Sequence, residues 1–418
     1  MSGQTVNDPH RRLTQADVDL ICVKHDRLFS SRPGGARAVF SWTDISGLDL
    51  SGRNLSDADF TGAILAGCRL IGTRLDNSVL FSADLQNADL TNVSLRRADL
   101  RGACLRGADL TGADLFEADL REGTIAAADA EKGFRILEPT KRASDVQGAI
   151  LIGANLERSK LSGALAVRAD FTDAILKDAK LVRANLTQAN MNGANLSGAD
   201  LTGADLAGAD LRDAVLVGAM TQSCKFDGAL MEGVLTDAPA GKSASTLPFA
   251  DMLREHALWC ESDGVMGKPS KFDEADLRSL GSISGYNLTA LSARGAVFYG
   301  LNMEGVQLQG AHLEGADMRN CNLRRADLRG ARLSNAKLSG SNLGEAQLGP
   351  LVIGQDRLLP CDLRGAMIKT ADLRGADLRG ALMTGSNLSR SDFTGALLRE
   401  SDLLGAHAEG AKGLGAVR

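Results

Sequence analysis

The sequence predicts an all-β solenoid, in which the chain winds around a narrow core and turns a corner at every fifth residue. The main observation is a period of five: across residues 194–216, ANLSGADLTGADLAGADLRDAVL, a leucine recurs at every fifth position from Leu196 to Leu216, and an alanine stands two residues before each leucine. A period of five matches neither the 3.6-residue repeat of a helix nor the two-residue repeat of a strand. The second observation is composition, since aromatic residues make up only 4% of the chain and glycines number 47. We therefore expect leucine and alanine to point inward and the other three residues to face solvent.

Four pentads would close one square coil of about 20 residues. Coils with strand-like backbones stack about 4.8 Å apart and exchange backbone hydrogen bonds, so that only the two ends of a stack leave backbone groups unpaired. Each central side chain contributes roughly 1.5–3 kcal/mol when it is buried. A second large residue at the alanine position would overpack the narrow interior. Such a stack needs caps at its ends.

The N-terminal region predicts a disordered segment followed by a capping helix. Residues 1–12 are polar and are expected to be disordered. Over residues 13–31, Thr14 resembles an N-cap with Asp17 in the first turn, and a Gly-rich connection at 33–35 ends the helix. The apolar residues at helical spacing are Val18, Ile21, Cys22, His25, Leu28 and Phe29.

The first array of pentads carries central residues at every fifth position from Phe40 to Ile125. The period breaks over residues 126–145 and resumes with central residues from Val146 to Met231. We interpret this break as a loop inserted between two coils. The loop concentrates apolar and basic residues, namely Phe134, Ile136 and Leu137 with Lys132, Arg135, Lys141 and Arg142.

A second module is predicted after a linker at residues 237–246. A helix beginning at Leu247 is expected to cap a further array, which starts at Phe272 and Leu277, slips by one residue, and holds its phase from Ile283 to Leu403. A shorter loop is expected at residues 349–360, where the count of five persists but the composition changes. Because His256 repeats the place of His25, we divide the chain into a module at 13–236 and a module at 247–418, each a capping helix followed by a β-helix.

The stretches GADLTGADLAGADL and DLRGADLRGAL resemble the pentapeptide-repeat family, whose unit is written A-[DN]-L-x-x. The resemblance covers residues 40–235 and 270–405, and it implies a right-handed quadrilateral β-helix. The helices with histidine are similar to segments that precede pentad arrays in other bacterial members. The family also implies end-to-end dimerisation. Because no capping helix is evident at the C-terminal end, we expect a homodimer through that end.

No catalytic, metal or cofactor site is predicted. Gly241, Lys242 and Ser243 resemble the end of a phosphate loop, but Thr236 stands where the first glycine is required. The five histidines show no ligand spacing, and the seven cysteines form no CxxC pair. Four cysteines (Cys68, Cys224, Cys321 and Cys361) replace the inward alanine. No leader and no apolar run long enough for a membrane span is evident, so the expected location is the cytoplasm.

The sequence favours a non-enzymatic protein–protein interaction scaffold, with a DNA-mimicking modulator or inhibitor of a type II topoisomerase such as gyrase as the alternative. That alternative follows from the family and needs a dense acidic surface. Two sets of aspartates are predicted to share faces, Asp59, Asp99 and Asp119 on one and Asp49, Asp89 and Asp109 on another, but Arg96, Arg97, Arg101 and Arg106 interleave with them. Direct nucleic-acid binding is disfavoured, because the net charge is −5 and the arginines of the last array fall on all four faces.

The inserted loop is the candidate partner-binding site. A partner of a repetitive rod would recognise what departs from the repeat, which here means Phe134, Arg135, Ile136 and Leu137. In the alternative interpretation, Phe134 and Ile136 fold back onto the rod. The sequence leaves both interpretations open.

Overall fold

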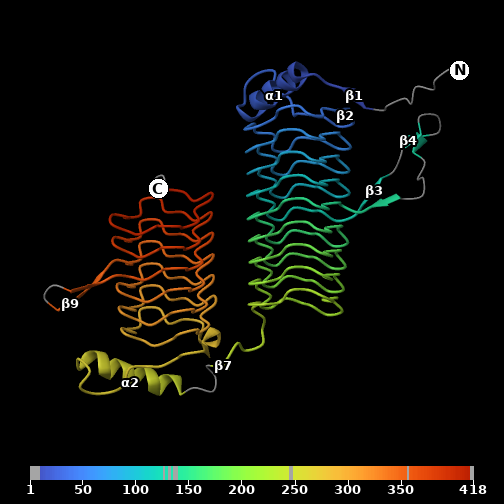
Figure 1. Cartoon of the computed structure of the whole chain (residues 1–418). Helices are drawn as coiled ribbons and strands as arrows, with labels where there is room; N and C mark the ends of the chain where they lie inside the picture. Colours follow the sequence, from blue (N-terminus) through green and yellow to red (C-terminus); the bar gives the residue numbers. More distant parts are fainter. Residues whose placement is uncertain are drawn as a thin grey trace. The chain divides into compact units, whose positions relative to one another are not determined.

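The computed structural model describes residues 10–125, 128–129, 133–134, 140–243, 248–354 and 357–414. The chain divides into two compact units, which we call unit 1 (Met1–Asp237) and unit 2 (Ala238–Arg418). Each unit is a stack of flat coils with one helix lying across its first coil (Figure 1). The two units are described separately.

The coils of unit 1 are joined by parallel backbone bridges between residues 20 positions apart. Successive bridges join Val39 to Asp59, Asp44 to Ile64, Asp49 to Arg69 and Asn54 to Arg74, and the same four columns continue down the stack. The amide of each central residue donates to the next coil, as when Phe40 N bonds the Asp59 carbonyl at 2.7 Å. The predicted all-β solenoid is thus confirmed as a β-helix whose coils contain four pentads.

Each corner is a four-residue turn that explains the polar part of the pentad. The amide of Thr43 donates to the carbonyl of Phe40 at 3.1 Å, and corresponding bonds close the later corners. The second residue after a central one has a positive φ, for example +72° at Gly47, which favours glycine, asparagine or aspartate. The aspartate or asparagine before each central residue accepts from the following turn, as Asp59 Oδ1 does from Thr61 N at 2.9 Å.

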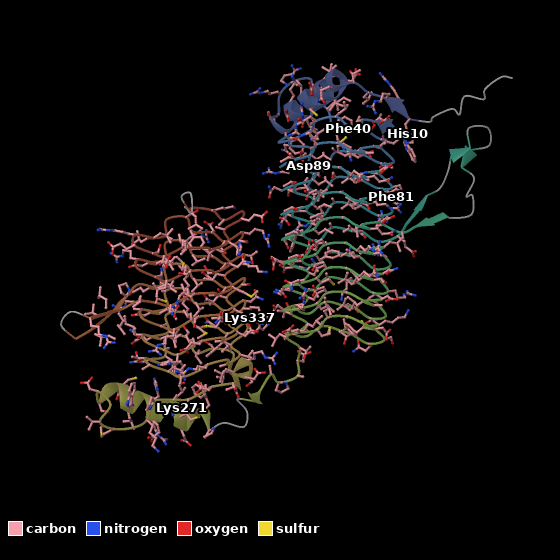
Figure 2. The ribbon with its side chains drawn as sticks, viewed as in Figure 1. His10, Phe40, Phe81, Asp89, Lys271 and Lys337 are labelled. Atoms are coloured by element: carbon pink, nitrogen blue, oxygen red, sulfur yellow. The ribbon has the colours of Figure 1, made fainter. Side chains whose placement is uncertain are left out.

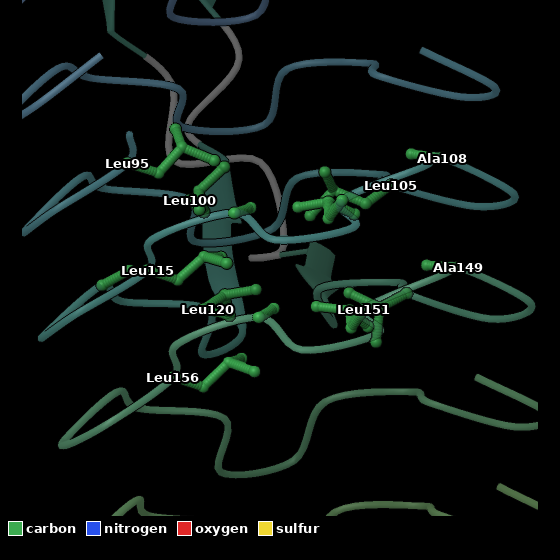
Figure 3. Close-up of a cluster of buried hydrophobic side chains, with 14 of the residues drawn as sticks. Leu95, Leu100, Leu105, Ala108, Leu115, Leu120, Ala149, Leu151 and Leu156 are labelled. Atoms are coloured by element: carbon green, nitrogen blue, oxygen red, sulfur yellow. The ribbon is translucent and has the colours of Figure 1, made fainter. Parts of the chain in front are cut away.

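The core contains two side chains per pentad. Leu201, Leu206 and Leu211 are fully buried, and so are the alanines two residues before them. Figure 3 shows leucines and alanines of successive coils pointing into the same interior. The spacing of five therefore fills a narrow tube, as predicted.

Helix α1 (Gln15–Phe29) lies across the first coil of unit 1 and begins at the predicted N-cap. Thr14 and Asp17 form a reciprocal capping box. The helix buries Val18, Cys22 and His25. Of the apolar residues predicted for this face, Leu28 and Phe29 are instead nearly half exposed, because Leu28 lies on the flank of the buried stripe and Phe29 is the last residue of the helix.

Part of the segment expected to be disordered is ordered. Strand β1 (Arg11–Arg12) pairs in parallel with β2 (Thr43–Asp44) at the first coil. The guanidinium of Arg12 donates to Asp44 Oδ1 at 2.6 Å, which holds the strand in place. The prediction for residues 1–12 is therefore wrong for Arg11 and Arg12, while residues 1–9 lie outside the described residues.

The break in unit 1 is a β-hairpin that leaves the coil after Leu120 and returns at Asp145, and we call it the first arm. Strands β3 (Gly123–Ile125) and β6 (Thr140–Arg142) pair antiparallel, as do β4 (Ala128–Asp129) and β5 (Gly133–Phe134). Asp145 bridges Cys104, so the coil resumes there. Ile125 therefore belongs to strand β3 of the arm, so the prediction that it is the central residue of a pentad in a coil is wrong.

Unit 2 begins with strand β7 (Lys242–Ser243), which pairs in parallel with β8 (Ala275–Asp276). Part of the segment predicted as a linker is thus a strand. Helix α2 (Phe249–Glu261) follows, and the 3-10 helix η2 (Arg278–Leu280) adds one residue to the first coil. Bridges at this coil consequently join residues 21 apart, Lys271 to Ser292, before the spacing returns to 20. This is the predicted slip of one residue after Leu277.

The second arm is the hairpin between Leu348 and Cys361. Strands β9 (Leu351–Ile353) and β10 (Arg357–Leu359) pair antiparallel, and the bridge from Arg332 reaches Asp362, ten residues further than usual. Ile353 and Leu358 keep the count of five, yet both side chains are exposed. The shorter loop predicted at residues 349–360 is therefore confirmed as a hairpin, and the count of five persists through it because the insertion is ten residues long. Within the described ranges, neither helix is long and apolar enough to cross a bilayer.

Candidate protein-interaction surfaces

The described residues do not assemble a chemical centre. Within them, no group of three or more histidine, cysteine or acidic side chains is placed to hold a metal ion. All seven cysteines are free thiols. Burial raises the pKa of the Cys68 thiol to about 11 and raises those of Cys321 and Cys361 further, so these thiols stay protonated and unreactive near neutral pH. Lys242 and Ser243, the end of the apparent phosphate loop, form strand β7.

Two buried histidines hold the helices to the coils. His25 Nδ1 accepts the amide of Ala38 at 3.0 Å, and His256 Nδ1 accepts the amide of Ser270 at 2.8 Å. Both rings are fully buried, and burial lowers the pKa of both histidines. Each ring is therefore neutral and structural, because accepting a hydrogen bond requires an unprotonated nitrogen.

Along the outer faces, arginine and aspartate neutralise each other locally. Wherever an aspartate before a central leucine is followed two residues later by arginine, the guanidinium donates two bonds to that carboxylate, as Arg374 does to Asp372 at 2.9 and 2.7 Å. Hydrogen bonds from Arg374 and Arg379 lower the pKa of Asp372 and Asp377. The other pairs of this kind are Asp99–Arg101, Asp119–Arg121, Asp210–Arg212, Asp276–Arg278, Asp327–Arg329 and Asp362–Arg364. A bidentate pair presents neither charge alone to a partner.

The predicted acidic columns exist but are interrupted. Asp99 bridges Asp119 and Asp89 bridges Asp109, whereas Val79 separates Asp59 from Asp99 and Arg69 separates Asp49 from Asp89. The four arginines predicted to interleave with them bind carboxylates, in the pairs Arg96–Asp114, Arg97–Glu117, Arg101–Asp99 and Arg106–Asp145. Unit 1 therefore lacks an unbroken run of unpaired acidic side chains along either column of its described residues.

The first arm is fastened at its base. Buried Ser144 takes the inward position, where its hydroxyl accepts the amide of Gly102 at 3.0 Å. Gly123 lies against the backbone of Arg101 and the ring of Phe81, where a Cβ would have 3.0 Å to the nearest atoms. Figure 2 shows Phe81 on the side of unit 1 from which the arm leaves. Of the candidate partner-binding residues, Phe134 ends strand β5, and Arg135, Ile136 and Leu137 lie outside the described residues.

A second aromatic side chain on the outside of unit 1 is enclosed by arginines. The guanidinium groups of Arg96 and Arg158 lie 4.6 and 5.7 Å from the ring centre of Phe116. Arg158 also binds Glu117 at 3.1 Å. Cation–π contacts of this kind hold the ring in one position. Sequence reasoning missed this cluster, although Phe116 is one of very few aromatic residues placed outside the core positions.

The second arm exposes apolar side chains that sequence reasoning did not single out. Leu351 and Leu359 pack over Gly330, where an added Cβ would lie 2.7 Å from Leu351 Cβ. Val352 and Leu358, paired across the hairpin, are both at least 60% exposed. The signal in the sequence was the pair of apolar runs LVI and LL within residues 351–359.

Exposed large hydrophobic side chains concentrate at the ends of the units and on the second arm. In the described part of unit 1 they are Leu20, Val23, Leu28, Phe29, Val39 and Trp42 near the first coil, Met220, Leu230 and Met231 at the last coil, and Ile150 alone between them. In that of unit 2 they are Leu258, Val265, Met266 and Tyr286 near the first coil, Val352, Ile353 and Leu358 on the arm, and Leu397 and Leu404 at the last coils. The outer faces of the coils between the ends of each unit carry mainly small or polar side chains, and many of their charged side chains form ion pairs with one another.

The family of the repeat is identified by comparison with family models. A model described as pentapeptide repeats (8 copies) matches overlapping stretches that span residues 38–123, 142–233, 307–344 and 361–412, which is more than half of the chain. A search of curated protein sequences finds no significant match.

Several solved structures are similar to this chain. HetL, a pentapeptide repeat protein involved in heterocyst differentiation regulation from the cyanobacterium Nostoc sp. strain PCC 7120, is 21% identical over 91% of this chain and 93% of its own, with a TM-score of 0.19. The pentapeptide repeat protein Rfr23 from the cyanobacterium Cyanothece 51142 is 28% identical over 33% of this chain and 91% of its own, with a TM-score of 0.25. QnrB1, a plasmid-mediated fluoroquinolone resistance protein, is 19% identical over 56% of this chain and 95% of its own, with a TM-score of 0.26.

Proposed function

The chain belongs to the pentapeptide-repeat family, a family of right-handed β-helices, and from this premise we propose that it is a non-enzymatic scaffold that binds other proteins. The observation that carries the proposal is the distribution of exposed large hydrophobic side chains, which gather at the ends of the units and on the second arm. Exposed apolar surface on an otherwise polar protein marks contact sites for partners. The coils between these contact sites, whose charged side chains pair with one another, act as spacers.

The proposed architecture has two modules, at residues 13–236 and 247–418, each a quadrilateral β-helix behind a capping helix. The repeated histidine contact supports it, because His25 and His256 accept the backbone amide two residues before the first central residue, Phe40 or Phe272. Four columns of bridges in each unit support the square cross-section. All seven cysteines are free, which favours a reducing compartment, and we propose the cytoplasm.

The first arm is proposed as one further recognition element, beside the unit ends and the second arm, through Phe134, Arg135, Ile136 and Leu137. A clean deletion is available: removing residues 122–142 and changing Ala143→Gly leaves Leu120 and Val146 five positions apart, with Ser144 at the inward site. The matched control replaces residues 350–360 by one glycine, which leaves Leu348 and Leu363 five positions apart and removes only the second arm.

Tagged wild type and both arm deletions are compared by quantitative co-purification from the native host. We expect a set of proteins to be retained by wild type and by the second-arm deletion and to be lost from the first-arm deletion. Equal retention of the same proteins by all three forms contradicts recognition by the first arm. Unchanged far-UV circular dichroism and melting temperature establish that each deletion leaves the coils intact.

The alternative function is a DNA-mimicking modulator of a type II topoisomerase. The adjacent pairs Asp89–Asp109 and Asp99–Asp119 favour it, while the arginine partners of the neighbouring carboxylates weaken it. A gyrase supercoiling assay decides between the two. Inhibition at micromolar protein supports mimicry, and unaltered supercoiling with retained protein partners supports the scaffold.

We propose no direct nucleic-acid binding, no membrane insertion and no cofactor, and a homodimer through the C-terminal end. The bidentate Asp–Arg pairs of the last coils support the first point. Leu397 and Leu404, which are 50% and 69% exposed, support the homodimer. Sedimentation analysis of Leu404→Glu tests the homodimer, since a carboxylate at that end would disfavour burial in an interface.

A further inference from the structure

The chain that joins the two units is held by hydrogen bonds on both sides of one peptide bond. Unit 1 ends at Asp237, whose Oδ1 accepts the amide of Gly218, in the last coil of that unit, at 2.8 Å. The next residue, Ala238, belongs to unit 2, and its carbonyl accepts the guanidinium of Arg278 at 3.0 Å. A single peptide bond therefore separates a residue held on unit 1 from a residue held on unit 2.

Residues 238–243, which we call the junction strand, are fastened along the first coil of unit 2. The amide of Ala240 donates to Asp276 Oδ2 at 3.1 Å, and β7 pairs in parallel with β8. Gly241 has a φ of +100°, and a Cβ at this position would lie 2.2 Å from the carbonyl oxygen of Glu274. Only glycine allows so close an approach, because the nearest atom belongs to the backbone of the coil and cannot move aside.

One ion pair of the first coil holds the junction strand. Arg278 donates to both carboxylate oxygens of Asp276, at 2.9 and 2.6 Å, and each of these two side chains also binds the backbone of the junction strand. Burial alone would raise the pKa of Asp276, but hydrogen bonds from Arg278 and from the amide of Ala240 lower it below its usual value, so the pair stays ionised at neutral pH. By contrast, the side chains of Asp372 and Arg374, within the described residues, bind no backbone outside their own turn.

The sequence also restricts the one link that remains free. Pro239 fixes its own φ, and it confines Ala238, the residue before it, to extended conformations. The side chain of Asp237 is held to Gly218 on the other side of the link. Rotation between the two fastened ends is therefore left mainly to the backbone of Asp237 and Ala238.

We propose that the junction strand is a strap, which the Asp276–Arg278 pair fastens to unit 2 so that a short, stiff link joins the two units. Releasing the strap would leave residues 238–248 as a flexible connection to α2, with a root-mean-square length of about 18 Å. In a scaffold with contact sites on both units, a stiff link limits the separations at which both sites can be engaged at once. That consequence rests on the proposed function, whereas the experiment below measures the link alone.

Two variants release the strap by different means. Gly241→Val places side-chain atoms against the backbone of the first coil, and Arg278→Gln removes the guanidinium that holds the strap. Each variant has a matched control. Gly354→Val introduces the same residue at a φ of +68°, where no atom lies within 4 Å of the added Cβ, and Arg374→Gln breaks an Asp–Arg pair that holds no strap.

Hydrogen exchange of residues 238–243 measures the fastening of the strap, and small-angle X-ray scattering of the full-length protein measures the freedom of the two units. We expect these amides to be protected in wild type and in both controls. In Gly241→Val and Arg278→Gln they should exchange at least about tenfold faster, because the hydrogen bonds of the strap are lost. In the same two variants alone, the pair-distance distribution should broaden. Far-UV circular dichroism and the melting temperature verify that all four variants keep their coils.

Three results overturn the proposal. Wild-type amides of residues 238–243 that exchange as fast as those of an unstructured chain exclude a strap, and unchanged exchange in Gly241→Val excludes the close contact that holds it. Faster exchange in both variants with scattering identical to that of wild type means that the strap does not stiffen the link. If Arg278→Gln unfolds unit 2, Gly241→Val still decides all three points, because its substitution lies outside the coils.

Discussion

The first coils of the two units are covered in the same way but fastened differently. In both, a helix buries a histidine whose Nδ1 accepts the backbone amide two residues before the first central phenylalanine. Around this shared bond unit 1 adds a capping box at Thr14, an ion pair between Asp19 and Arg53, and reciprocal bonds between Gln15 and the backbone of Asp49. Helix α2 begins at Pro248 with no side-chain cap.

The contacts that both helices share indicate what a helix over a first coil requires, and the contacts that only one helix makes indicate what is optional. In later pentads the amide of the inward residue donates to the central carbonyl three residues earlier, as Ala58 N does to Leu55 at 3.2 Å. No such corner precedes the first pentad, and an orphaned buried donor is costly. A neutral histidine satisfies that donor in both units, so it is the common element. Within the described residues α2 has no side-chain cap, and its one further side-chain bond to the coil is that from Ser270 Oγ to the Met252 carbonyl at 3.0 Å. The chain supplies one tryptophan reporter per unit, Trp42 and Trp259, so the variants Trp259→Phe and Trp42→Phe make the unfolding of each unit visible alone.

The largest expected effect comes from removing the first central side chain. Phe40→Ala and Phe272→Ala each delete a fully buried ring and should lower the free energy of unfolding of their own unit by about 3–5 kcal/mol. The ring of Phe40 stacks on that of Phe60 with 4.9 Å between the ring centres, whereas the ring centres of Phe272 and of Phe249 in α2 are 5.7 Å apart. Only Phe272→Ala should therefore also shift the emission of native Trp259, which lies in α2. Denaturant titrations followed by fluorescence measure both effects, and Leu358→Ala, at a 60% exposed position on the second arm, is the control.

Replacing the histidines should have the next largest effect. His25→Leu and His256→Leu keep the volume but leave the amides of Ala38 and Ser270 without an acceptor, which should cost about 1–3 kcal/mol in each unit. Because α2 has fewer other fastenings, His256→Leu should loosen its helix more, seen as faster hydrogen exchange in α2 than His25→Leu causes in α1. If α1 in His25→Leu and α2 in His256→Leu exchanged their amide hydrogens equally fast, the extra bonds of α1 would contribute nothing to holding that helix on its coil. His407→Leu, at an exposed site, is the control.

The sequence predicted the features that repeat and the two interruptions of the repeat, but not the residue at which the backbone leaves the coil in the first interruption. Leu201 and its equivalents could be assigned inward because the period of five recurs in every coil. Ile125 was assigned to the array of pentads for the same reason and instead lies in strand β3, since a strand entering an arm can preserve the count while its backbone leaves the coil. Leu20 and Val23 were not singled out, because the helical spacing identified only the stripe of Val18, Cys22 and His25, which the structure buries. The cluster at Phe116 depends on contacts between coils, since its two arginines, Arg96 and Arg158, lie 20 and 42 residues from it along the chain.

Acidification should destabilise both units through the same histidines. Burial lowers the pKa of His25 and His256, so the unfolded chain, with a pKa of about 6.5, binds a proton more readily than the folded one. Stability should be constant above about pH 7 and should fall as the pH drops below about 6.5. Unit 1 gives the cleaner measurement, because burial also lowers the pKa of His312 in unit 2.

The pH test compares the unfolding of unit 1 in wild type and in His25→Gln between pH 7.5 and about 5, above the range where most carboxylates titrate. The variant should remove most of the decline seen in wild type, since glutamine accepts a hydrogen bond and does not titrate. An unchanged slope would assign the decline to other groups.

The smallest expected effect is confined to the N-terminus of α1. In Thr14→Ala the amide of Asp17 loses its acceptor and the Asp17 carboxylate loses the hydroxyl that it accepts from at 2.7 Å. Loss of an N-cap typically costs about 1 kcal/mol. The free energy of unfolding of unit 1 should fall by about that amount. That of unit 2 should not change, because Thr14 caps only α1 and α2 has no side-chain cap. The Thr14→Ser variant keeps the hydroxyl and should retain wild-type stability. If Thr14→Ala instead matched the loss caused by His25→Leu, the capping box and not the buried histidine would be the principal fastening of α1, and the comparison between the two first coils would have to be reversed.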